Sequence, residues 1–161
     1  YSIAITIAEL IPDDKDWDIQ IVGTDISPAA VEQASSGVYD QFEIKRGLKP
    51  YYADKYFVQD SDGWKVCDDI RSICTFKEGN LHSAFEHLGT FDVIFCRNVA
   101  IYFSDSDRRT LFERLSDVLA SNGWLIVGSS ESLRNLGTRW HPEQHCRANC
   151  YQPNKNLEAS V

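Results

Sequence analysis

Methionine is absent from the 161-residue sequence, and so is any apolar run long enough to span a membrane. A transmembrane helix needs about 20 consecutive, mostly apolar residues, and the first residues lack the pattern of a signal peptide. Because translation starts at methionine, the chain cannot begin at its own start codon, and we expect it to be a piece of a longer protein. We expect that protein to act in the cytoplasm without direct membrane insertion.

Basic residues are also few. The sequence has 16 lysines and arginines against 24 aspartates and glutamates, which gives a formal net charge of −8. A nucleic-acid-binding protein needs a positively charged face, so we expect no nucleic-acid partner. The composition, 43% hydrophobic and 25% charged, is otherwise typical of a globular protein, and the length suits one domain with a buried core.

Motifs of metal centres and of common hydrolases are missing as well. The five cysteines contain no C-x-x-C pair, which indicates a reduced set of buried thiols. A group of histidines and cysteines near the carboxyl end does not have the spacing of known zinc sites, so we expect no metal. That group is His141, His145, Cys146 and Cys150. The G-x-S-x-G elbow, the P-loop and the H-E-x-x-H helix do not occur.

The most informative stretch that is present is Phe91–Phe103. Its first half, Phe91–Cys96, is a short apolar run of aromatic and β-branched residues, which predicts a strand buried on both faces of a parallel sheet. Arg97 and Asn98 follow where that strand ends, and Tyr102 lies four residues beyond Asn98. Ligands of open α/β sheets bind beyond the carboxyl ends of the strands, so these side chains are candidates for chemistry. The alternative is that they only cap the strand.

Helical and strand patterns alternate along the rest of the chain, which favours an α/β fold. We expect helices over Tyr1–Ile11 and Pro28–Ser36, a short helix around Ser83–His87, and a helix that starts at Ser104 or Asp105 and ends at Asn122-Gly123. That last helix has an apolar stripe of Leu111, Phe112, Leu115, Val118 and Leu119. We expect strands over Ile19–Thr24, Trp124–Gly128 and Cys146–Gln152, and a disordered tail after Pro153.

Asp25 follows the strand predicted at Ile19–Thr24. An acidic residue at this place in a doubly wound sheet can accept hydrogen bonds from ribose hydroxyls, in nicotinamide-dinucleotide enzymes as in others. The alternative is that Asp25 only starts the next helix. Ser27 followed by Pro28 is a better helix start, which leaves Asp25 free for a ligand.

The segment between residues 38 and 79 is too long for a simple helix-to-strand connection and predicts an inserted subdomain. Val38–Phe57 has no clear periodicity, and Asp62-Gly63 is a hairpin signal with Trp64–Cys67 and Ile73–Lys77 as candidate flanking strands. Ile73–Gly79 can also serve as the third parallel strand, which then ends at Asn80-Leu81. The basic side chains of the segment are local positive charge in an acidic protein; they are Lys45, Arg46, Lys49 and Lys55.

The stretch from Arg97 to Phe103, R-N-V-A-I-Y-F, closely resembles the R-N-V-x-I-Y-F signature of the CheR-type chemotaxis receptor methyltransferases. The resemblance runs from Tyr1 to about Tyr151. Ser129–Leu133 resembles the family's G-x-S-E segment, and Tyr1-Ser2 matches the end of its cofactor loop, G-E-E-P-Y-S. The resemblance implies a Rossmann-like class I methyltransferase domain with a mostly parallel sheet and a small inserted antiparallel β subdomain. The domain would span residues 1–152, with the insertion at 38–79 and a flexible tail at 153–161.

The same resemblance implies the chemistry. These enzymes transfer a methyl group from S-adenosyl-L-methionine to receptor glutamates and release S-adenosyl-L-homocysteine. Arg97 and Tyr102 would be the catalytic residues: Arg97 would orient the acceptor carboxylate by a charge-assisted pair, and Tyr102 would donate to it or help to place the methyl group. The cofactor would bind to Asp25 through its ribose, to Asn80 and Leu81 through its adenine, and to Arg97 and Asn98 near the methyl group.

The implied partners are the cytoplasmic helices of chemotaxis receptors, and we expect a monomer. The strand and most of the cofactor loop that precede the first helix in the family are not in this sequence. We therefore expect the 161 residues alone to bind the cofactor weakly or not at all, and to be inactive. Two alternatives remain: a catalytically silent sensing or docking module, and a dinucleotide oxidoreductase, for which the R-N-V-A-I-Y segment has no role.

Overall fold

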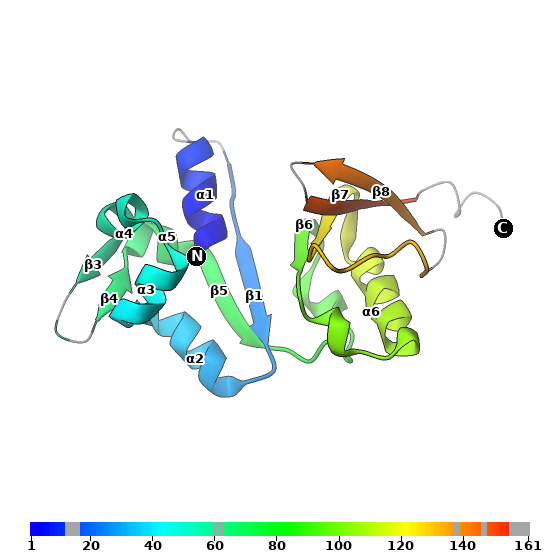
Figure 1. Ribbon diagram of the computed structural model, residues 1–161, viewed down its shortest axis with the longest axis horizontal. Helices are drawn as coiled ribbons and strands as arrows, with labels where there is room; N and C mark the ends of the chain where they lie inside the picture. The colour runs from blue at the N-terminus through cyan, green and yellow to red at the C-terminus, as the bar shows by residue number, and fades with distance from the viewer. Residues whose placement is uncertain (12–16, 60, 62, 137–138, 146–147, 155–161) are drawn as a thin grey trace. The chain divides into compact units, whose positions relative to one another are not determined.

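The computed structural model describes residues 1–11, 17–59, 61, 63–136, 139–145 and 148–154. The chain divides into two compact units, Tyr1–Asn80 and Leu81–Val161, and each unit has a hydrophobic core of its own (Figure 1). Among the described residues, no helix is both long and apolar enough to cross a bilayer.

The first unit is built on two parallel strands, β1 (Ile21–Asp25) and β5 (Cys74–Glu78). Helix α1 (Ser2–Leu10) buries Ala4 and Ile5 in a cluster with residues of both strands. The helix expected at Tyr1–Ile11 and the strand expected before Asp25 are thus confirmed, and the segment from Ile73 serves as a parallel strand.

Helix α2 (Pro28–Ser36) begins and ends as its sequence predicts. Ser27 Oγ accepts a hydrogen bond from the backbone N–H of Ala30, and Pro28 occupies the first turn. Gly37 ends the helix in the left-handed region with a φ of 68°, where a residue without Cβ is favoured. Both caps are formed by residues close together in the sequence, which is why the start and the end of this helix could be predicted from the sequence alone.

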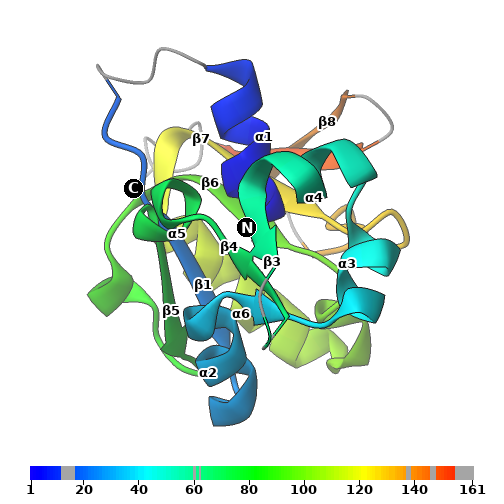
Figure 2. The same cartoon turned by 90° about the vertical axis from the view of Figure 1, so that its left-hand side faces the viewer.

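The inserted segment is more regular than expected. It contains β2 (Val38–Tyr39), α3 (Gln41–Gly47), α4 (Pro50–Tyr56), β3 (Phe57–Gln59), β4 (Trp64–Val66) and α5 (Asp68–Ser72). The three strands form an antiparallel sheet in the order β2-β4-β3, of which Figure 2 shows β3 beside β4. The absence of structure expected over Val38–Phe57 was therefore wrong, because Asp40 and Glu43 form a reciprocal capping box and Pro50 starts the next helix.

The hairpin expected near Asp62-Gly63 is present, but between other strands than expected. β3 and β4 flank it, whereas Ile73–Lys77 lies in the parallel pair. Gly63 has a φ of 137° and its backbone lies so close to the Tyr39 carbonyl that a Cβ would be 2.6 Å from that oxygen. Asp62 itself is outside the described residues.

The second unit is a four-stranded sheet in the order β6-β7-β9-β8. Strand β6 (Phe91–Cys96) pairs parallel with β7 (Leu119–Val127), and β9 (Ala148–Pro153) is antiparallel to both β7 and β8 (Trp140–His145). Short 3-10 helices lie at Glu86–Leu88 (η2) and Ala100–Tyr102 (η3). The first of these replaces the helix expected around Ser83–His87.

Helix α6 (Asp105–Asp117) packs against this sheet, as Figure 1 shows, and Ser104 caps its first turn. The predicted apolar stripe is confirmed on the helix for Leu111, Phe112 and Leu115, which are buried. Val118 and Leu119 are buried as well, but they follow the last residue of the helix. The end expected at Asn122-Gly123 was wrong. The helix stops at Asp117, and these two residues lie within β7 at a shift in its register with β6.

Strand β6 is at the edge of the sheet, and of the described strands only β7 pairs with it. Its side chains alternate: Ile94 and Cys96 pack on the core, whereas Val93 and Phe95 are 45% and 46% exposed. The prediction of a strand buried on both faces was therefore wrong. The closing antiparallel strand predicted at Cys146–Gln152 is confirmed as β9, although Cys146 and the tail from residue 155 lie outside the described residues.

Candidate functional site

The loop that follows β6 carries three of the predicted site residues. Arg97 and Asn98 are exposed directly after the strand, and Tyr102 is 82% exposed at the end of η3. Asn98 has a φ of 59° and is the one residue other than glycine with positive φ in the described chain. Such a conformation is uncommon, and it occurs where the surroundings hold the backbone in place.

A buried carboxylate lies beneath this loop. Glu131 is only 3% exposed, and its Oε2 atom accepts hydrogen bonds from the backbone N–H groups of Asn98 (2.8 Å) and Gly128 (2.7 Å). Its Oε1 atom accepts from the backbone N–H of Ala100 (3.1 Å). One side chain thus joins the loop after β6 to the loop after β7.

The loop after β7 is held from a third strand. Asn149 of β9 pairs in register with Val127 of β7, and its Nδ2 atom donates to the carbonyls of Gly128 (3.4 Å), Ser129 (3.3 Å) and Glu131 (3.0 Å). Sequence reasoning did not assign a role to Glu131 or Asn149. The S-S-E-S-L segment was a signal for Glu131, but the contacts of both residues depend on strand pairing that the sequence does not reveal.

Cys96, the last residue of β6, is buried on the core side of the loop. Burial and the neighbouring Glu131 carboxylate raise the pKa of its thiol to about 11. The group therefore stays protonated near neutral pH, which makes it a poor nucleophile. It is one of four described cysteines, all of them free thiols, of which Cys96 and Cys150 are buried and Cys67 and Cys74 half-buried.

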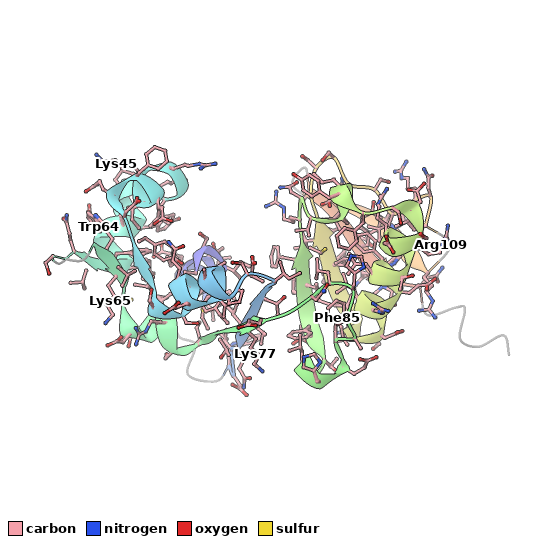
Figure 3. The ribbon with its side chains drawn as sticks, turned by 90° about the horizontal axis from the view of Figure 1, so that it is seen from below. Lys45, Trp64, Lys65, Lys77, Phe85 and Arg109 are labelled. Carbon is pink, nitrogen blue, oxygen red and sulfur yellow. The ribbon has the colours of Figure 1, made fainter. Side chains whose placement is uncertain are left out.

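The segment before η2 lies beside the same loop within the second unit. The His82 ring stacks on Phe103, with centroids 4.6 Å apart and 12° between the planes. Arg114 Nη1 donates to the His82 carbonyl, and Leu81 packs against the core cluster of the unit. Figure 3 shows Phe85 and Arg109 in this unit; Arg109 Nη1 donates to the Leu136 carbonyl (3.0 Å). The structure therefore brings the Leu81 segment next to the loop that carries Tyr102.

The other predicted residues lie in the first unit. Asp25 and Asn80 are at the carboxyl ends of two paired strands, and the backbone N–H of Gly79 donates to the Asp25 carbonyl (2.9 Å). The Asp25 side chain is exposed, but it is not free as expected, because its Oδ1 atom accepts a hydrogen bond from the backbone N–H of Ser27 (2.8 Å). Ser27 caps the helix with its own side chain and at the same time donates its N–H to Asp25.

The predicted residues thus form two sets, one in each unit. Asp25 and Asn80 belong to the first unit, and the second contains Leu81, Arg97, Asn98 and Tyr102. Within the described part of the chain, no group of three or more His, Cys, Asp or Glu side chains has the arrangement of a metal site.

Comparison with known proteins decides the family. The sequence profile of the CheR methyltransferase, SAM binding domain, matches residues 1–148. The chain belongs to this family. It is 38% identical over 144 residues to a chemotaxis protein methyltransferase of Vibrio parahaemolyticus, covering 84% of this chain and 50% of that protein. It is 41% identical over 119 residues to chemotaxis protein methyltransferase 1 of Pseudomonas aeruginosa, covering 73% and 43%.

The chain spans about half the length of the curated relatives that it matches. Among solved structures, the LepI complex with SAM has a TM-score of 0.53 at 9% identity, covering 94% of this chain and 40% of that chain. A likeness at that identity concerns the fold alone. The family and the mixed parallel and antiparallel sheets confirm the expected Rossmann-like α/β class, and S-adenosylmethionine is the cofactor of the domain family.

Proposed function

We propose that the chain is the core of an S-adenosylmethionine-dependent methyltransferase that methylates glutamate side chains of chemotaxis receptors. The observation that carries the proposal is the loop after β6, where Arg97 and Tyr102 are exposed while the backbone between them is fixed. Family membership supports the cofactor, and the relatives named as chemotaxis protein methyltransferases support the pathway.

Methyl transfer from a sulfonium is an in-line displacement at carbon, so it mainly requires that donor and acceptor are held close and aligned. A glutamate side chain, with a reference pKa of about 4.3, is already ionised at neutral pH and needs no general base. It does need to be oriented after it loses water. The Arg97 guanidinium provides a charge-assisted pair for the acceptor carboxylate, and the Tyr102 hydroxyl donates a further hydrogen bond.

The cofactor contacts are part of the same proposal. Asp25 retains a second carboxylate oxygen besides the one bonded to Ser27, and this oxygen accepts from the ribose hydroxyls. Asn80 and Leu81 contact the adenine. Asn98 and Arg97 contact the part of the cofactor that carries the methyl group. We further propose that residues 1–152 form the methyltransferase domain, with 38–79 as its inserted β subdomain.

The receptor partner is acidic, and so is this chain. Salt screens the repulsion between the two at distances beyond about 8–10 Å. At shorter distances, positive charge at the end of α3 and at the start of α4 offsets the repulsion. Lys45 and Arg46 lie in the last turn of α3, where Figure 3 shows Lys45, and Lys49 precedes α4; all three are exposed. Lys55 contributes less than expected from the sequence, because its Nζ atom is 2.7 Å from Glu9 Oε1.

The test is methyl transfer from tritium-labelled S-adenosylmethionine to receptor cytoplasmic helices by the full-length protein. Arg97→Ala should lower kcat/KM roughly 100-fold, because the acceptor loses its orienting partner. Tyr102→Phe should lower kcat/KM by a smaller factor. Arg134→Ala, which removes an exposed arginine of the same unit, is the matched control and should retain activity.

Unchanged transfer in both site variants would contradict the catalytic roles. A protein that binds S-adenosylhomocysteine in calorimetry but transfers no methyl group would instead support the silent sensing or docking module.

A further inference from the structure

Glu131 is the one charged side chain that is buried among the described residues. Its three hydrogen-bond donors are backbone N–H groups, at 2.7, 2.8 and 3.1 Å, and they come from two loops at the carboxyl ends of neighbouring parallel strands. A buried carboxylate is costly unless its oxygens are satisfied, and here both oxygens are. The three hydrogen bonds therefore stabilise the buried charge where the carboxyl ends of β6 and β7 lie side by side.

We propose that Glu131 is a positioning residue for methyl transfer: its carboxylate fixes the backbone at Asn98 and Ala100 so that Arg97 and Tyr102 meet the acceptor in one arrangement. The proposal rests on the proposed function and adds a residue to it. Glu131 itself is buried beneath the loop and acts through the two exposed side chains.

The position of the contacts supports this role. The first contact is one residue after Arg97, and the second is at the first residue of η3, two residues before Tyr102. The backbone N–H of Tyr102 in turn donates to the Val99 carbonyl (3.3 Å). The backbone of the catalytic segment is thus anchored at two points, while both working side chains stay exposed.

The conformation of Asn98 is a second argument. Its φ of 59° is unfavourable for a residue with a Cβ atom, and the Glu131 contact to its N–H stabilises it. The loop after β7 is also closely packed. A Cβ atom at Gly128 would overlap with Asn98 Oδ1 and would lie 2.6 Å from Glu131 Oε2. Asn149 completes the arrangement by holding the carbonyl of Glu131.

A purely structural role for Glu131 is the competing explanation, and graded variants of the full-length protein separate the two. Glu131→Gln preserves the shape. The side-chain oxygen of the glutamine can take the place of Oε2 and keep the contacts to the N–H groups of Asn98 and Gly128. Its NH2 group then faces the N–H of Ala100, so that two donors meet and this hydrogen bond is lost. Glu131→Ala removes all three contacts. Glu113→Gln makes the same chemical change at an exposed position of α6 and is the control.

The first readout is the kinetics. We expect kcat to fall about 10-fold in Glu131→Gln and about 100-fold in Glu131→Ala. In a background that carries both Arg97→Ala and Tyr102→Phe, Glu131→Gln should lower kcat little further, because both side chains that Glu131 is proposed to place have been removed. Glu113→Gln should behave like the parent protein in both backgrounds.

The second readout does not depend on activity. In amide NMR spectra, Glu131→Gln should move the Ala100 resonance more than those of Asn98 and Gly128. An equal fold-loss of kcat in the parent and in the background that lacks both side chains, or an unaffected Ala100 amide, would overturn the positioning role. If the parent protein transfers no methyl group while the Ala100 amide responds as described, the anchoring of the loop is supported and the proposed function is what fails.

Discussion

At the scale of single residues, Arg97 and Tyr102 are exposed, whereas Glu131, which accepts hydrogen bonds from the backbone between them, is buried. Arg97 and Tyr102 were found because polar residues after an apolar strand are visible in the sequence, and their exposure agrees with a role in ligand contact. Glu131 could not be found in this way. From the sequence, an acidic residue in a short polar segment is expected to be exposed to solvent. Only the pairing of β6, β7 and β9 shows that Glu131 is buried and surrounded by backbone N–H groups.

Gly128 allows a test at this scale. Gly128→Ala should lower the free energy of unfolding by about 1–3 kcal/mol, since the added methyl group would overlap with Asn98 and Glu131 in a packed site. Urea denaturation measures the change. Gly47→Ala is the control, because nothing lies within 4 Å of a Cβ at that position and alanine is the better helix former. Equal stability of Gly128→Ala and the parent would contradict the close packing.

At the scale of elements, prediction succeeded where the determining interactions are local. The caps of α2 and the apolar stripe of α6 are set by residues within three or four positions of one another. Strand β8 was not predicted, because His141, Pro142 and Glu143 lack an apolar alternation and the strand exists through its pairing with β9. Helix α3 was missed although Asp40 and Glu43 carry a capping signal, because no apolar period accompanies it.

The contact between α1 and α4 leads to a pH prediction. Glu9 accepts hydrogen bonds from Lys55 (2.7 Å) and from the Tyr56 hydroxyl (2.6 Å), and these bonds hold the pKa of its carboxyl below the ordinary value of 4.5. Because the folded pKa is lowered, the stabilisation is complete above about pH 4.5 and is lost as the pH falls through the folded pKa. Glu9→Gln should therefore show a smaller drop in Tm between pH 6 and pH 3, roughly the range of carboxyl titration.

Differential scanning calorimetry across that range measures the difference. Glu32→Gln removes an exposed carboxylate on α2 and serves as the control. A Glu9→Gln profile parallel to that of the parent would show that the pair contributes nothing to acid stability.

At the scale of the whole molecule, family and fold class were predictable, and the arrangement of the site was not. The seven-residue signature from Arg97 to Phe103 was enough to indicate the family, and the matching profile confirms it over residues 1–148. The two sets of predicted site residues, however, belong to separate units with separate cores. Which strands share a core depends on long-range contacts, and a short motif carries no information about them.

Cofactor affinity is the prediction that belongs to this scale. Titration calorimetry should detect weak or no binding of S-adenosylhomocysteine to the 161 residues, and clear binding to the full-length protein. The reason is that the 161 residues span about half the length of the curated relatives that they match. Tight binding by the 161 residues would contradict this expectation.

The buried thiol of Cys96 can serve as a chemical probe of local opening at the end of β6. The thiol is 6% exposed and directly precedes Arg97, and its pKa of about 11 leaves little thiolate at neutral pH. Alkylating reagents can therefore modify it only after the strand end has opened, whereas the half-buried Cys67 is more accessible. The labelling rate of the Cys96 sulfur thus measures how often the end of β6 and the loop after it open.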